Sequence, residues 1–272
     1  MSMSLRNELR QPLLDATLYR ETYNWETWYR YVKDGASAIN SANPDVLVFL
    51  SGLNSDVDLG AVVQGTALTP GTDKFSLDDF DGFANRLVLE LHNYEFTYAT
   101  DNCTQLSNKL LDAGFSGLSS SAKNQFPVIM TEFGFPQDAT TWKGEYASCI
   151  AKFLQAQRAG WTIWVLAGSY YLREGAQDSD EPWGLLTHDW SDWRSPEYVD
   201  GGLMPLVKAS LAGEGGDGSQ VTGSPDGDGS GSGSNSNPKD NGSGLVVPAL
   251  PSWALGAVGC AALFTLRDLY IL

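Results

Sequence analysis

Two glutamates stand at the ends of apolar runs and have the residue type that glycosidic-bond chemistry requires. Glu8 lies in MSLRNE near the start of the sequence, and Glu132 lies in VIMTEFG. Glycoside hydrolysis needs two carboxyl groups, one that protonates the leaving oxygen and one that attacks the sugar or activates water. A glutamate in an apolar run is costly to bury unless it is paired. We expect Glu8 and Glu132 to form such a pair, with a structural salt bridge as the alternative for Glu132.

Further polar and aromatic side chains follow other apolar runs. His92 and Tyr94 follow RLVLEL, and because they alternate, both side chains would point the same way on a strand. There they could orient a carboxylate and hold it ionised, with core packing as the alternative. Trp164 could stack on a sugar face. Three more tryptophans could line a longer groove: Trp183, Trp190 and Trp193.

These residues depend on elements that place the ends of several strands together. Short runs rich in Val, Ile and Leu, typical of strands buried on both faces, cover residues 46–50, 86–91, 126–130 and 161–167. MSLRNE could end one more strand. Helix-like stretches alternate with them at residues 25–39, 103–113 and 142–159, and we expect these to end before Asn43-Pro44, at Gly114 and at Gly160.

This alternation predicts a parallel α/β sheet. In a (β/α)8 barrel, the C-terminal ends of the strands converge on one face, where active sites are built. The run at 46–50, for example, leads to the polar residues Asn54, Ser55 and Asp56.

Composition excludes several classes of function. The formal net charge is −16, which argues against a nucleic-acid partner, whose phosphates need a basic surface. Two histidines and three cysteines argue against a zinc site built from those ligands. The P-loop, the dinucleotide fingerprint and the GxSxG elbow are absent from the sequence.

Three regions of different composition divide the sequence. We expect a globular domain over residues 1–212, a disordered Gly/Ser-rich linker over 213–244 and a hydrophobic tail over 245–272. The uncharged part of the tail is long enough to cross a bilayer as a helix, and it also fits the signal for a GPI anchor. A third alternative is that the tail does neither. The first two alternatives place the globular region at the cell surface. The first ten residues have no apolar core, so we do not expect them to act as a secretory signal, and we expect the signal to have been lost with strands missing from the start of the chain.

Taken together, the candidate residues resemble glycoside hydrolase family 5, the cellulase family. Asn7-Glu8 matches the dipeptide that closes the fourth barrel strand in that family. The resemblance implies that Glu8 is the acid/base and that Asn7 contacts the sugar 2-hydroxyl. Leu9 departs from the pattern, because many members have proline there.

The other catalytic positions match in the same chain order. His92-Asn93-Tyr94 matches the His-x-Tyr after the sixth strand, and TEFG around Glu132 matches the context of the nucleophile on the seventh. Trp164 matches the tryptophan of the eighth strand that forms the floor of a sugar subsite. The resemblance implies a retaining O-glycosyl hydrolase of β-linked glucans or mannans that needs no metal and no cofactor. It also favours a Cys103–Cys149 disulfide, with two free thiols as the alternative.

The matching pattern begins at the fourth strand. We therefore expect an incomplete (β/α)8 barrel of about strands four to eight, the C-terminal part of a larger, secreted and monomeric enzyme. Five strands cannot close such a barrel, so we expect the chain on its own to be weakly stable and weakly active. The alternative is a truncated, non-catalytic glycan-binding protein at the cell surface, or a defunct glycosidase-like protein.

Overall fold

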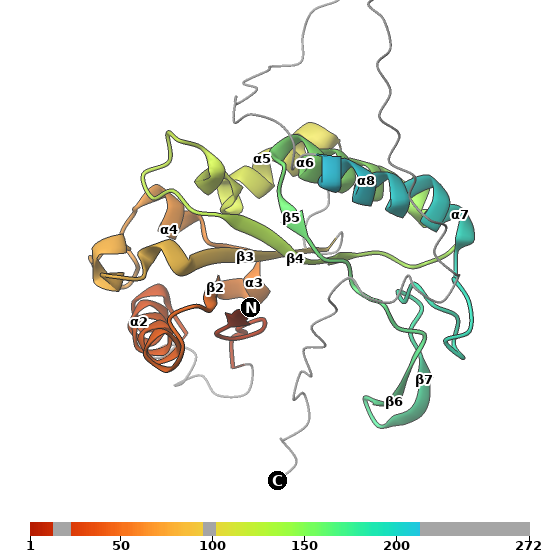
Figure 1. Cartoon of the computed structure of the whole chain (residues 1–272), viewed down its shortest axis with the longest axis horizontal. Coiled ribbons are helices and arrows are strands. Elements are labelled where there is room, and N and C mark those ends of the chain that lie inside the picture. Colours follow the sequence, from red (N-terminus) through yellow and green to blue (C-terminus); the bar gives the residue numbers. More distant parts are fainter. Residues whose placement is uncertain (13–22, 95–101, 213–272) are drawn as a thin grey trace, which may run out of the picture. The chain divides into compact units, whose positions relative to one another are not determined.

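The computed structural model of the chain (Figure 1) describes residues 1–12, 23–94 and 102–212. The predicted linker over 213–244 and the predicted tail over 245–272 lie outside the described residues. No helix within the described ranges combines the length and the apolar character needed to span a membrane.

A parallel sheet of five strands forms the centre of the fold. In chain order and in spatial order these are β1 (Ser2–Ser4), β2 (Leu47–Ser51), β3 (Leu87–Tyr94), β4 (Val128–Gly134) and β5 (Gly160–Trp161). Every position of β3 is buried, as expected for a central parallel strand covered on both faces. Within the described residues, β1 and β5 each pair with one neighbour, so the sheet is an open part of a barrel.

Helices follow the strands in the expected alternation. The four longer ones are α2 (Trp25–Ala42), α5 (Cys103–Ala113), α6 (Glu145–Gln157) and α8 (Met204–Ala212). Helices α5, α6 and α8 lie together on one side of the sheet (Figure 1). Asn24 caps α2 by accepting the Thr27 N–H at 2.8 Å, and α2 ends at Ala42, before Asn43-Pro44, as the sequence predicts.

The remaining elements are short. They comprise α3 (Leu53–Asp56), α4 (Gly60–Gln64), α7 (Pro196–Tyr198), the 3₁₀ turns η1 (Leu77–Phe80), η2 (Ala84–Arg86), η4 (Phe115–Leu118) and η5 (Thr141–Lys143), the π-turn η6 (Val199–Leu203), and the antiparallel hairpin of β6 (Ser169–Arg173) and β7 (Ala176–Asp180). The hairpin projects away from the five-stranded sheet (Figure 1).

Two predicted elements differ from the structure. The third predicted helix ends earlier, because Arg158 adopts the left-handed conformation (φ 49°) and caps α6, while Gly160 already belongs to β5. Regular pairing in the fifth predicted strand stops after Trp161. Beyond that point the chain follows β4 by single bonds, as the N–H groups of Thr162 and Trp164 donate to Met130 O at 2.9 Å and Phe133 O at 2.8 Å.

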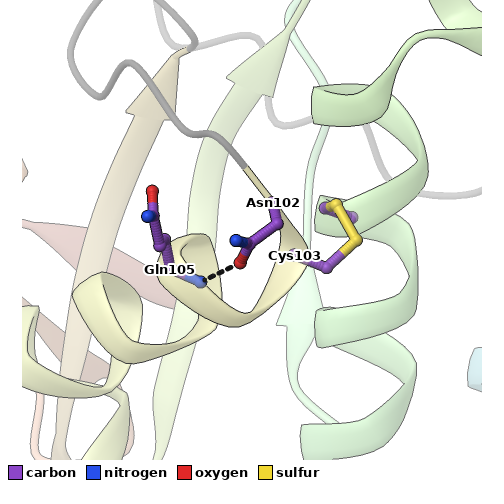
Figure 2. Close-up of a disulfide and its surroundings, with 4 residues drawn as sticks. Asn102, Cys103 and Gln105 are labelled. Carbon is purple, nitrogen blue, oxygen red and sulfur yellow. Dashed lines mark hydrogen bonds between the residues drawn. A yellow bond between two sulfur atoms is a disulfide. The ribbon is translucent and has the colours of Figure 1, made fainter.

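A disulfide joins α5 to α6. Cys103, the first residue of α5, is bonded to Cys149 in α6, with 4.9 Å between their Cα atoms (Figure 2). Asn102 caps the same helix by accepting the Gln105 N–H at 3.0 Å. A disulfide of this kind stabilises a fold mainly by restricting the unfolded chain.

The hydrophobic core lies between the sheet and its helices. Val48 and Leu50 of β2, Leu89 of β3 and Leu106 of α5 are fully buried. Burial of each such side chain contributes about 2 kcal/mol. This core holds the strand ends that carry the candidate site.

Candidate active site

The segment after β1 and the C-terminal halves of β3 and β4 bring three of the sequence-predicted residues together. One side-chain oxygen of Glu8, one ring nitrogen of His92 and one side-chain oxygen of Glu132 all lie within 4.8 Å of one another. Parallel strands end at the same edge of a sheet, so residues far apart in the sequence meet there. The two glutamates therefore form the pair that the sequence predicts.

His92 lies between the two glutamates. Its Nδ1 is 3.2 Å from Glu8 Oε1 and 3.4 Å from Glu132 Oε2, and its side chain is only 3% exposed. Its Nε2 lies 3.8 Å from Asp56 Oδ2. Burial by itself would lower the pKa of His92, but the hydrogen bond to Glu8 and the charges of Glu132 and Asp56 outweigh it and raise the pKa.

Glu8 has contacts on both of its carboxylate oxygens. Oε2 accepts from Arg10 Nη2, and Oε1 faces His92. Burial acts to raise the pKa of Glu8, but these two contacts outweigh it and lower the pKa, so the carboxylate is ionised at neutral pH. The backbone of Glu8 is left-handed (φ 46°) and its N–H donates to Asp56 Oδ2 at 2.7 Å.

Tyr94 holds the second glutamate. Its hydroxyl donates to Glu132 Oε2 at 2.8 Å. Burial and the neighbouring Glu132 charge raise the pKa of Tyr94 far above its usual range, so the phenol remains a donor. The ring of Trp183 contacts that of Tyr94, with 5.7 Å between centroids.

Two further acidic residues, which match no motif of the family pattern, belong to the site. Asp56 is fully buried, and burial raises its pKa to about 7. Glu90 is 5% exposed and accepts from Ser4 Oγ, and burial raises its pKa as well. The signal for Asp56 was its place just after a strand, and the signal for Glu90 was a charge inside the apolar run RLVLEL.

The other predicted site residues lie nearby or face solvent. The N–H of Trp164 donates to Phe133 O, which places this half-buried residue beside the end of β4. A Cβ on Gly134 would lie 2.4 Å from Trp164 O, so only glycine permits this approach. Asn7 is exposed, and its side chain makes no hydrogen bond to the described residues. Trp190 and Trp193 are 51% and 40% exposed.

The glutamates and His92 also have the atoms that could hold a metal ion. Two carboxylate oxygens and one imidazole nitrogen are common ligands of divalent transition metals. Among the described residues, this is the one group of three whose ligand atoms converge so closely. The hydrogen bonds within the group account for the same closeness.

Comparison with known proteins gives one family. A family model described as cellulase (glycosyl hydrolase family 5) matches residues 3–169. A glycosyl hydrolase 5 family protein from Chamaecyparis obtusa is 32% identical over 210 residues, which are 73% of this chain and 34% of that protein.

Solved structures show the likeness in fold. A β-glucanase from Saccharophagus degradans matches with a TM-score of 0.50 and 16% identity, over 76% of this chain and 53% of the glucanase. An endocellulase variant from Pyrococcus horikoshii, solved with cellotetraose, matches with a TM-score of 0.53 and 15% identity, over 76% of this chain and 57% of the endocellulase. The incomplete (β/α)8 fold is thereby confirmed. The chain spans about a third of the curated relative and little more than half of either structure.

Proposed function

The chain belongs to glycosyl hydrolase family 5, the cellulase family, and on this basis we propose that it carries the two catalytic glutamates of a retaining β-glycosidase. The substrates would be β-linked glucans or mannans, cleaved at their O-glycosidic bonds. The convergence of Glu8 and Glu132 on either side of His92, within 4.8 Å, carries the proposal. Retaining glycosidases hold their two carboxyl groups about 5 Å apart, whereas inverting enzymes leave room for a water.

In the proposed first step, Glu132 attacks the anomeric carbon while Glu8 gives a proton to the departing glycosidic oxygen. In the second step, Glu8 takes a proton from water, and the resulting hydroxide releases the sugar from Glu132. Tyr94 and His92 both contact Oε2 of Glu132, which fixes the orientation of the nucleophile. Asn7 would bind the sugar 2-hydroxyl, and Trp164 would form the floor of the subsite.

The first step requires Glu8 in its protonated form. Arg10 and His92 hold Glu8 ionised in the present arrangement. The Arg10 side chain is 55% exposed, so a bound sugar can displace it. Loss of that contact would raise the pKa of Glu8 toward the value that a general acid needs.

A mechanism-based label tests the proposal. A dinitrophenyl 2-deoxy-2-fluoro-β-glycoside transfers its fluorosugar to the nucleophile and releases dinitrophenolate. Intact-mass measurement of the full chain should show one added fluorosugar, located on the peptide that contains Glu132.

Variants separate the two roles. Glu132→Gln should take no label. Glu8→Gln should still be labelled, because dinitrophenolate needs no proton to leave, but should release the sugar more slowly. Glu174→Gln, at an exposed glutamate of the β6–β7 hairpin, is the matched control and should behave as wild type. Labelling of Glu132→Gln at the wild-type rate would refute the assignment.

A second function, glycan binding without hydrolysis, is favoured by the open sheet and by exposed aromatic side chains. Tyr171 is 87% exposed and Trp190 is 51% exposed. A chain of this class would bind β-glucan with equal affinity after both Glu8 and Glu132 are replaced by Gln, and would take no label. Isothermal titration with cellotetraose distinguishes the two functions.

We also place the protein at the cell surface, attached through its C-terminal tail. The Cys103–Cys149 disulfide supports an oxidising compartment. Treatment of expressing cells with phosphatidylinositol-specific phospholipase C should release the protein if the tail is a GPI signal, and should leave it bound if the tail is a membrane helix.

A further inference from the structure

An unusual turn lies beside the acid/base residue. Asn54, Ser55 and Asp56 have φ angles of 57°, 63° and 61°. L-residues avoid this left-handed region, at a cost of roughly 1–2 kcal/mol each. Consecutive residues held there mark a segment whose surroundings enforce its shape, often for function. We call residues 54–56 the left-handed turn.

Four hydrogen bonds, two of them made by Tyr23, link this turn to residues 8 and 9, which follow β1. The Glu8 N–H donates to Asp56 Oδ2 at 2.7 Å, and the Ser55 N–H donates to Leu9 O at 2.9 Å. The Tyr23 hydroxyl donates to Leu9 O at 2.9 Å and accepts from the Asn54 N–H at 2.6 Å. The turn thus binds the backbone N–H of Glu8 and the backbone C=O of Leu9, and it fixes where the Glu8 side chain starts.

Asp56 contacts a second residue of the site. The oxygen that accepts the Glu8 N–H also lies 3.8 Å from His92 Nε2. Asp56 Oδ1 is buried and accepts no hydrogen bond from the described residues. A buried carboxylate oxygen without a donor is costly, so an aspartate here lowers the stability of the fold. Its presence is therefore explained by a function and not by stability.

We propose that the left-handed turn positions the acid/base of this site, with Asp56 as the positioning residue that holds the Glu8 backbone and the far side of the His92 ring at once. The inference rests on the proposed function in treating Glu8 as the acid/base, but the contacts themselves can be tested without any activity.

The charge of Asp56 should be measurable at His92. The ionisable groups that act on His92 are Glu8 from the segment after β1, Asp56 from the turn, Glu132 from β4, and Glu90 from β3 itself. Of these, Asp56 is the one placed opposite Nε2. Removing its charge should therefore lower the pH at which His92 titrates.

Two variants separate the charge from the hydrogen-bond acceptor. Asp56→Asn keeps a carbonyl oxygen for the Glu8 N–H and loses the charge, whereas Asp56→Leu loses both. The chain has only two histidines, so NMR titration of the ¹⁵N-histidine-labelled full chain gives two imidazole signals, assigned with His188→Gln. Amide hydrogen exchange at Glu8 reports the hydrogen bond.

We expect His92 to titrate at lower pH in both variants. Exchange at Glu8 should stay slow in Asp56→Asn and become at least tenfold faster in Asp56→Leu. Asp180→Asn, which changes the exposed acidic neighbour of His188, is the matched control and should move only the His188 titration.

An unchanged His92 titration in Asp56→Asn would overturn the proposal, as would unchanged Glu8 exchange in a folded Asp56→Leu. If Asp56→Leu does not fold, the titration in Asp56→Asn decides. If the fluorosugar does not label Glu132 but these shifts are observed, glycoside hydrolysis is refuted and the positioning role stands. If Glu132 is labelled but the shifts are absent, the positioning role is refuted and glycoside hydrolysis stands.

Discussion

The two histidines of the chain have similar partners but different surroundings. His92 Nδ1 lies 3.2 and 3.4 Å from two carboxylate oxygens, and the ring nitrogens of His188 lie 3.0 and 3.2 Å from oxygens of Asp178 and Asp180. The side chain of His92 is 3% exposed, whereas that of His188 is 43% exposed. In both cases carboxylate contacts raise the histidine pKa. Distances alone therefore do not identify the active site.

The carboxylate groups around His92 and around His188 differ in where they lie along the chain and in how their charges are balanced. The partners of His188 lie only eight and ten residues away along the chain, and Arg194 pairs with Asp180 at 2.7 Å. The partners of His92 come from separate strand ends. Ion pairs exposed to water contribute little, whereas buried charges interact strongly and their arrangement is expensive to change. A buried excess of carboxylates suits a reaction in which positive charge develops on a sugar.

The largest expected difference concerns two tyrosines that each donate to a glutamate. Tyr94 donates to Glu132 and Tyr170 donates to Glu181 at 2.7 Å. Under the proposed function, Tyr94→Phe should lower kcat/KM roughly 100-fold, because the nucleophile loses its orienting bond. Tyr170→Phe should leave kcat/KM unchanged and cost about 1 kcal/mol of stability. Hydrolysis of an aryl β-glycoside and urea unfolding measure the two effects, and equal losses of activity would remove the distinction.

The next effect is the pH dependence of stability. Burial raises the pKa of Asp56 to about 7 in the folded chain, while an unfolded aspartate titrates near 4. The folded state then holds more protons than the unfolded state between these values, so the free energy of unfolding should fall as pH rises toward 7. The raised pKa of His92 lowers the free energy of unfolding further as pH rises through the pKa that His92 has in the folded state. The lowered pKa of Glu8 affects the free energy of unfolding only in acid, where stability is lost as pH falls below the ordinary pKa of a glutamate.

Urea unfolding at pH 5 and pH 8 tests this dependence. Wild type should be less stable at pH 8 by on the order of 2–4 kcal/mol, and Asp56→Asn should remove most of that difference. Asp180→Asn should keep it, because the Asp180 carboxylate is exposed. Equal pH slopes in wild type and Asp56→Asn would contradict the role given to burial.

A smaller effect is expected from relief of backbone strain near each histidine. Ser55 in the left-handed turn and Asp178 in the β6–β7 hairpin both have positive φ angles. Ser55→Gly should stabilise the chain by about 0.5–1 kcal/mol, because glycine adopts this conformation without a steric penalty. Asp178→Gly should stabilise the chain less, because this substitution also removes the contact of Asp178 with His188. Thermal unfolding measures both, and a destabilised Ser55→Gly would contradict the assignment of strain.

Salt should produce the smallest change. Raising NaCl from 20 to 500 mM should lower the pH at which His188 titrates, because exposed charges are screened, and should move His92 much less. The NMR titration of the two imidazoles measures this directly. Equal shifts would show that the His92 cluster is open to solvent.

The strands of the sheet could be predicted because a parallel strand that is buried on both faces consists of a continuous run of apolar residues. The apolar runs at 46–50, 86–91 and 126–130 correspond to β2, β3 and β4. Boundaries were less predictable. Arg158 ends α6 in a conformation that sequence patterns assign to glycine. Regular pairing of β5 stops after Trp161, and only single bonds from Thr162 and Trp164 connect the following residues to β4.

The candidate site was predictable where strand ends carry residues matching a family pattern. Glu8, His92, Tyr94 and Glu132 were found in this way. Asp56 follows a strand but matches no motif of the family pattern, and its role depends on three consecutive left-handed residues, which side-chain types do not encode.

The sequence by itself determined the alternation of strands and helices, the residue types at each strand end and the family, because these depend on local patterns of apolar and polar residues and on short motifs. Only the tertiary structure decided that His92 and not His188 is buried among carboxylates, and that one oxygen of Asp56 contacts Glu8 and faces His92. Burial and backbone geometry arise from contacts between residues distant in sequence, and those contacts set the charge states on which the chemistry depends.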